Sequence, residues 1–197
     1  MKQSKKERAM KNLDMDKKLY TIIVHSENVA GVLNQVTAVF TRRQINIESL
    51  NVSASSIPGV HKYTITAWTD PDTMEKVAKQ ISKKIDVVQS QYFTDDNIFQ
   101  YEIALYKLKT SVLESNKEVS KVIRRSGARI VEVNSVYSIL VKDGLSSEIT
   151  DLDDQLMQLD CVLQFVRSGR IAVTKSSFER VDDYLLRRQA KYEEFKI

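Results

Sequence analysis

The sequence predicts an α+β fold made of two ferredoxin-like βαββαβ domains in tandem. Two observations predict it. Apolar segments with strand and helix periodicity follow one another in the order β-α-β-β-α-β, and the same order begins again about 80 residues further along the chain. Because each repeat is long enough to bury a core of its own, we expect one domain over 19–94 and a second over 100–175.

Each element of the first domain has its own signal. The first strand is a compact apolar run rich in β-branched residues, and the first helix carries an apolar stripe at helical spacing. In the next strand the apolar parity changes between Ile47 and Leu50, which predicts a β-bulge. Asp70 and Pro71 open the second helix, whose apolar face we expect to reach Ile85. In order, these elements cover 19–25, 32–43, 45–55, 60–68, 72–85 and 87–93.

The second domain repeats the order with shorter elements. Its first helix is expected to end at Gly127, because glycine readily takes the left-handed conformation of a helix C-cap. The second helix is marked by leucine and isoleucine at helical spacing. The expected elements are a strand over 101–109, a helix over 116–126, a hairpin-like pair over 129–134 and 136–141, a helix around 149–159, and one or two strands within 162–166 and 171–173.

The net charge of +4 is confined to one end of the chain. Residues 1–18 carry seven basic and three acidic side chains, whereas the remainder carries 23 of each sign. We interpret 1–18 as a disordered basic tail, with a DNA-contacting arm as the alternative, and 176–197 as a charged helical extension.

No apolar run is long enough to span a membrane, and no signal peptide is recognisable. A single cysteine, Cys161, fits a cytoplasmic protein and is interpreted as a buried hydrophobe.

Catalytic and metal-binding motifs are missing from the sequence. It has no HExxH, CxxC or GxSxG pattern and no Walker or dinucleotide-binding glycine motif. His25 and His61 could meet across neighbouring strands, but two polar residues on a sheet or interface explain them better. Asp151, Asp153 and Asp154 are interpreted as a solvated helix face. We therefore expect no catalytic residue, no metal site and no cofactor in this chain, which is typical of a binding protein.

The entry to the first helix is the candidate binding site. Gly31 would let a ligand approach the backbone, and the first-turn N–H groups would attract a carboxylate. Asn28 and Asn46 could hold the charged ends of an amino acid. The alternative is an ordinary helix N-terminus capped by Asn28, and the residues alone leave both open. The candidate site residues are Asn28, Val29, Ala30, Gly31, Val32, Leu33, Asn46 and Ile47.

Three segments resemble the ACT domain family and, more closely, the small regulatory subunits of acetolactate synthase (acetohydroxyacid synthase). They are ENVAGVLNQV over 27–36, INIESLNV over 45–52 and VRSGRIAVTK over 166–175. The resemblance implies an N-terminal ACT domain followed by a C-terminal ferredoxin-like domain. It also implies a non-catalytic, cytoplasmic subunit that activates the catalytic large subunit in branched-chain amino-acid biosynthesis. Thiamine diphosphate, a divalent metal and FAD are then expected on that large subunit.

The resemblance further implies feedback inhibition by a branched-chain amino acid, usually valine, bound between the ACT domains of a homodimer. Asn28, Gly31 and Asn46 match the family's site positions, whereas Ala30 replaces the small polar residue or proline often found before the glycine. Nucleic acid and membrane are not expected partners. The alternatives are an ACT-type amino-acid sensor that regulates another enzyme or transcription, and a small enzyme on the same scaffold.

Overall fold

The computed structural model describes residues 17–176, which divide into two compact units. Within the described residues, the first unit comprises 17–99 and 172–176, and the second comprises Gln100–Ile171. Residues 172–175, which the sequence analysis assigned to the second domain, thus lie in the first unit. Nearly all of the predicted basic tail and of the C-terminal extension lies outside the described residues. No helix between residues 17 and 176 is both long and apolar enough to cross a membrane.

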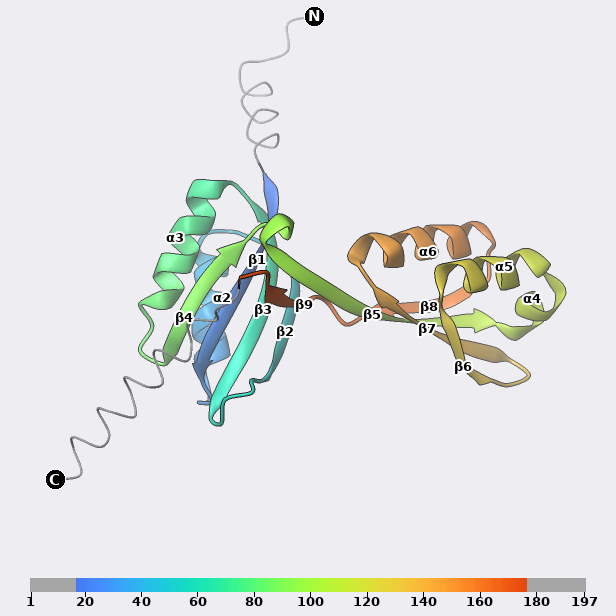
Figure 1. Cartoon of the computed structure of the whole chain (residues 1–197), viewed down its shortest axis with the longest axis horizontal. Helices are drawn as coiled ribbons and strands as arrows, with labels where there is room; N and C mark the ends of the chain where they lie inside the picture. The colour runs from blue at the N-terminus through green and yellow to red at the C-terminus, as the bar shows by residue number, and fades with distance from the viewer. Residues whose placement is uncertain (1–16, 177–197) are drawn as a thin grey trace, which may run out of the picture. The chain divides into compact units, whose positions relative to one another are not determined.

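The first unit is an antiparallel four-stranded sheet with two helices, in the predicted order β-α-β-β-α-β (Figure 1). The strand order across the sheet is β2-β3-β1-β4, so β2 and β4 are the edges. Both helices contribute side chains to one core cluster with the sheet, which places them in a single layer. The elements are β1 (Lys18–Glu27), α2 (Val32–Arg42), β2 (Ile47–Ala54), β3 (Val60–Thr69), α3 (Pro71–Ser82) and β4 (Val87–Phe93).

Strand β1 is buried on both of its faces. Ile22 and Val24 point into the core beneath the helices. Ile23, on the opposite face, packs in a separate small cluster with Ile98 and Ala172. Alternate side chains of a strand point to opposite faces, so burial on both sides explains the near-continuous apolar run that the sequence shows here.

The first unit has the predicted bulge in β2 and the predicted start of α3, but α3 is shorter than predicted. The register between β2 and β3 shifts between Ile47 and Ser49, which confirms the predicted bulge. Asp70 is the N-cap of α3, and its Oδ1 accepts a hydrogen bond of 2.9 Å from the N–H of Thr73. The expected burial of Ile85 is wrong: α3 ends at Ser82, and the Ile85 side chain is 95% exposed in the loop that follows.

The second unit repeats the ferredoxin-like pattern, with strand order β6-β7-β5-β8 and with β9 pairing to β5. Its core forms between this sheet and the helices α5 and α6. Gly127 caps α5 in the left-handed conformation, at φ 70°, as predicted. Its elements are β5 (Ile98–Lys109) from Gln100 onward, α4 (Thr110–Ser115), α5 (Lys117–Ser126), β6 (Arg129–Val133), β7 (Tyr137–Gly144), α6 (Ser146–Gln158) and β8 (Val162–Arg167). The 3-10 turn η1 (Asp95–Asn97) and, apart from Ile171, strand β9 (Ile171–Thr174) belong to the first unit.

Candidate functional site

Helix α2 begins without a side-chain cap. Its N-cap residue is Gly31, at φ 91°, a left-handed conformation that L side chains rarely adopt. No side chain hydrogen-bonds to this end of the helix, and its first turn contains no acidic residue. Asn28 lies three residues earlier, where its backbone N–H donates to the Gly59 carbonyl oxygen at 3.0 Å. The alternative in which Asn28 caps the helix is therefore wrong for this structure.

The open end of α2 combines the positive end of the helix dipole with exposed apolar side chains. The N–H groups of a first helical turn have no partner within the helix, and together they attract a negatively charged group. Val29 and Leu33, which flank this turn, are 50% and 37% exposed. Asn28, Ala30 and Gly31 are also exposed. The arrangement can hold a carboxylate with an aliphatic group beside it, which is the chemistry of an aliphatic amino acid.

Two of the candidate residues have other roles in the core. Val32 is 1% exposed and packs between α2 and the sheet, so its side chain is turned away from the open helix end. Ile47 is half-buried and packs against the same core. Asn46 is exposed and immediately precedes β2.

Asn28 and Asn46 lie at opposite ends of the first unit. Eleven helical residues separate the two loops that carry them, a length of about 16 Å. The strand register agrees: Ile47 lies opposite Ala67, near the start of β1, whereas Asn28 follows directly after the end of β1. One chain therefore does not bring these two side chains together.

The histidines and the cysteine do not form a reactive site. The register places His25 opposite Lys62 and His61 opposite Ser26, so the two imidazoles point to opposite faces of the sheet. Cys161 is fully buried, and its Sγ donates to the Leu156 carbonyl oxygen at 3.4 Å. Burial raises the pKa of this thiol, which keeps it protonated and unreactive near neutral pH.

The aspartates on α6 are not all solvated. Asp151 and Asp154 are exposed, as expected, but Asp153 is half-buried. Burial, and secondly the charge of Asp154, raise the pKa of the Asp153 carboxyl. Across residues 17–176, no group of three or more histidine, cysteine, aspartate or glutamate side chains is placed to hold a metal ion.

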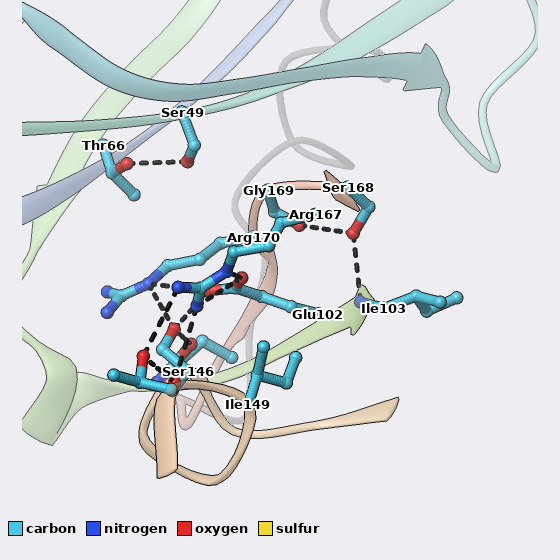
Figure 2. Close-up of polar contacts among 12 residues, drawn as sticks. Ser49, Thr66, Glu102, Ile103, Ser146, Ile149, Arg167, Ser168, Gly169 and Arg170 are labelled. Atoms are coloured by element: carbon cyan, nitrogen blue, oxygen red, sulfur yellow. Dashed lines mark hydrogen bonds and ion pairs between the residues drawn. The ribbon is translucent and has the colours of Figure 1, made fainter. Parts of the chain in front are cut away.

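The RSG segment, residues 167–169, forms a polar clamp in the second unit together with Arg170, as Figure 2 shows. Arg167 binds the buried carboxylate of Glu102 with two nitrogens: Nε and Nη2 lie 2.9 and 2.8 Å from Oε2. Ser168 pairs with Ile103 twice, accepting from its N–H through Oγ at 3.0 Å and donating its own N–H to the Ile103 oxygen at 2.9 Å. Arg170 Nε donates to Ser146 Oγ at 3.1 Å. These contacts fix the turn after β8 to β5 and to the start of α6.

Sequence reasoning missed Glu102 and Ser146, the acceptors of this clamp. A signal for Glu102 exists. It has the same strand parity as Ala104 and Tyr106, which point into the core, so it is an acidic residue at an inward position. Such a residue needs a partner of opposite charge, because an isolated buried carboxylate is strongly unfavourable.

Two family models match the chain, one after the other. Residues 22–89 match the AHAS small subunit-like ACT domain, and residues 101–176 match the small subunit of acetolactate synthase. The chain belongs to the acetolactate synthase small-subunit family. The matched ranges contain both the open end of α2 and the RSG clamp, so the motifs quoted from the sequence are parts of the family's two domains.

Relatives of known name agree with this assignment to the acetolactate synthase small subunits. The chain is 29% identical to the acetolactate synthase small subunit of Bacillus subtilis over 165 residues, covering 83% of this chain and 94% of the relative. It is also 29% identical to that of Haemophilus influenzae over 149 residues, covering 76% and 91%. The crystal structure of the Thermotoga maritima small subunit matches with a TM-score of 0.73 at 25% identity, over 82% of this chain and 99% of that one.

Proposed function

We propose that this chain is the regulatory subunit of a cytoplasmic acetolactate synthase. In this role it binds and activates the catalytic large subunit and makes that enzyme sensitive to feedback inhibition by a branched-chain amino acid, with valine as the effector. The reaction chemistry belongs to the large subunit, where we place thiamine diphosphate, a divalent metal and FAD. Family membership supports the regulatory role, and the uncapped end of α2 supports the sensing role.

The observation that carries the effector site is the missing cap of α2. Helix N-termini are normally satisfied by a side-chain oxygen, and removing such a cap costs about 1 kcal/mol. Here Gly31 takes the cap position, and although the Val32 N–H donates to the Val29 carbonyl oxygen at 3.4 Å, no side chain caps the first turn, which leaves room for an external acceptor. The effector's carboxylate would fill this role, with Val29 and Leu33 beside its aliphatic side chain.

A homodimer completes the site. Strand β2 pairs only with β3 among the described residues, so its other edge is available. Two-fold antiparallel pairing of two β2 edges would place the start of one strand beside the end of the other. Asn46 of one protomer would then reach the open α2 end, with Asn28 and Gly31, of its partner. Each dimer would hold two equivalent sites across the interface.

Regulation follows from differential binding. An effector held by two protomers stabilises the dimer arrangement that it fits. It inhibits the enzyme only where that arrangement engages the large subunit less productively, and a typical coupling of about 1–3 kcal/mol changes affinity by roughly 5- to 150-fold.

Substitution of Gly31 tests the sensing role. Gly31→Asp places a carboxylate at the open helix end, where it would repel the effector's own carboxylate. An added Cβ would meet no atom within 4 Å, so crowding does not obscure the result. Gly31→Asn is the matched control, because it has the same shape and the same left-handed backbone cost without the charge.

The measurement is acetolactate formation by the large subunit with each variant, over a valine titration, together with valine binding by calorimetry. We expect both variants to activate the enzyme, and Gly31→Asp to lose valine binding and inhibition while Gly31→Asn retains more of both. Unchanged valine binding in Gly31→Asp would refute the site. Valine binding by the wild type without activation of the large subunit would instead point to another regulated enzyme.

A further inference from the structure

A polar cavity of about 450 Å³ opens between α5 and α6 of the second unit. This volume is within the range of small-molecule sites, which is roughly 300–1,000 Å³. Both helices and strand β7 contribute side chains to its wall, far along the chain from the open end of α2. The side chains that carry the argument are Val122, Arg125, Lys142, Glu148, Asp151 and Gln155.

Lys142 is a cation at an inward position. On β7 it shares its strand face with Ser138 and Leu140, which are buried against the helices. Its side chain is 10% exposed, and its Nζ lies 3.0 Å from Oε2 of Glu148. Burying an ammonium group is costly even when it is paired, so a buried lysine in a cavity wall needs an explanation.

Gly144 makes room for this ion pair. Its backbone is ordinary strand and does not itself require glycine. A Cβ at this position would overlap the Glu148 carboxylate and lie 3.1 Å from Lys142 Nζ. The cavity wall is therefore shaped around the two charged groups rather than filled by a side chain.

The charges of the wall are balanced. Arg125 and Lys142 supply two positive groups, and Glu148 and Asp151 supply two negative groups. A simple anion or cation would meet repulsion from one pair, whereas a zwitterion can place a carboxylate near the arginine and an ammonium near the aspartate. The wall is more polar than apolar, with Val122 and Leu152 as its apolar members, which favours a ligand with a short or polar side chain.

We propose that this cavity is a second small-molecule site, and that it binds a free α-amino acid with a short or polar side chain. Arg125 and Lys142 receive the carboxylate, and Asp151, with Glu148, receives the α-ammonium group. The site lies wholly in the second unit and does not depend on the effector site proposed at α2.

The test uses the full-length chain labelled with ¹⁵N, titrated separately with glycine, alanine, serine, asparagine and glutamine at millimolar concentration. The readout is the amide shifts of 122–126 and 148–155. Asp151→Asn removes an exposed negative group of the wall, and Lys142→Met removes the buried positive group. Lys121→Met is the control, because Lys121 is an exposed lysine on α5 outside the cavity wall.

We expect at least one of these amino acids to shift both sets of amides in the wild type, in Lys121→Met and in Gly31→Asp. Loss of one charge-assisted hydrogen bond should weaken this binding by about tenfold or more in Asp151→Asn and in Lys142→Met. The proposal is overturned where none of the five amino acids shifts these amides, or where Asp151→Asn binds as tightly as the wild type. A response that disappears in Gly31→Asp would also overturn it, because the shifts would then originate at α2.

Discussion

At the scale of single residues, the second unit holds a buried carboxylate, that of Glu102, among cationic side chains. It is 5% exposed and receives two nitrogens of Arg167, which is itself 33% exposed. The hydroxyl of Ser146 donates to the same carboxylate, and Nε of Arg170, which unlike Arg167 is buried, lies 3.6 Å from it. The carboxylate thus holds two cationic side chains of the RSG turn against the start of α6.

Glu102→Gln should destabilise the protein, because the shape is kept but the buried positive charge loses its counter-ion. We expect a loss of about 2–4 kcal/mol in the free energy of unfolding, lower than for a fully buried pair because Arg167 reaches solvent. Arg167→Lys should cost less, since it keeps the charge and loses only the two-nitrogen geometry. Urea denaturation measures both. A loss below about 0.5 kcal/mol in Glu102→Gln, the size of an ordinary surface change, would contradict this assignment.

The residues of the candidate site were only partly predictable from the sequence. Gly31 was identified correctly as the special backbone position, because few other residues suit the conformation that it adopts. Val32, another candidate site residue, has its side chain in the core, because helical spacing does not tell which face of the first turn meets the core. The alternative in which His25 and His61 meet is wrong, and it could not be tested from the sequence because it depends on a strand register that the sequence does not encode locally.

At the scale of elements, helix α3 shows how a local cap couples stability to pH. Hydrogen bonds from Thr73, first through its side chain and then through its backbone N–H, lower the pKa of the Asp70 carboxyl. A carboxyl whose pKa is lower in the folded state stabilises the fold when it is ionised. This contribution is present above the ordinary aspartate pKa of 3.8 and is lost as the pH falls through the lower folded value.

Asp70→Ala should therefore destabilise the protein at neutral pH by about 1 kcal/mol, the typical cost of losing an N-cap. The difference from the wild type should shrink in acid, because protonation weakens the cap of the wild type as well. Asp70→Asn is the control: it keeps an acceptor for the Thr73 N–H but cannot titrate, so its stability relative to Asp70→Ala should change little with pH. Thermal denaturation at neutral pH and below pH 3.8 makes the comparison. A deficit in Asp70→Ala that is equally large in acid would show that the carboxylate charge is irrelevant.

Elements with a strong local signal were predicted well, and those decided by distant contacts were not. The caps at Asp70 and Gly127 and the bulge after Ile47 all follow from neighbouring residues, and the structure has them in place. Ile85 continues the helical spacing beyond Ser82, but the helix has already ended, so spacing alone overestimated the helix length. The short helix α4 was missed because its six residues are too few to show a period.

At the scale of the whole molecule, the tandem repeat was readable from the sequence, but the path of the chain between the repeats was not. The order of elements depends on periodicity, which each segment carries by itself. The return of the chain to the first unit at Ala172 depends on contacts with Ile23 and Ile98, and no local pattern reports contacts across such a distance.

If the proposed site is assembled from two protomers, two defective variants should restore binding when they are mixed, which a site within one chain could not do. Gly31→Asp damages the α2 side of every site, and Asn46→Ala damages the β2 side, so each homodimer should bind valine weakly or not at all. In a mixed dimer one site contains both substitutions, and the other has an intact Gly31 from one protomer and an intact Asn46 from its partner. Random reassociation of equal amounts should therefore restore about a quarter of the wild-type sites. Calorimetric titration of the co-refolded mixture counts them. If the mixture binds no more valine than the two separate variants, the site is not assembled from two protomers in this way. Both residues would then have to act within one chain, where the length of α2 keeps them too far apart to share one ligand.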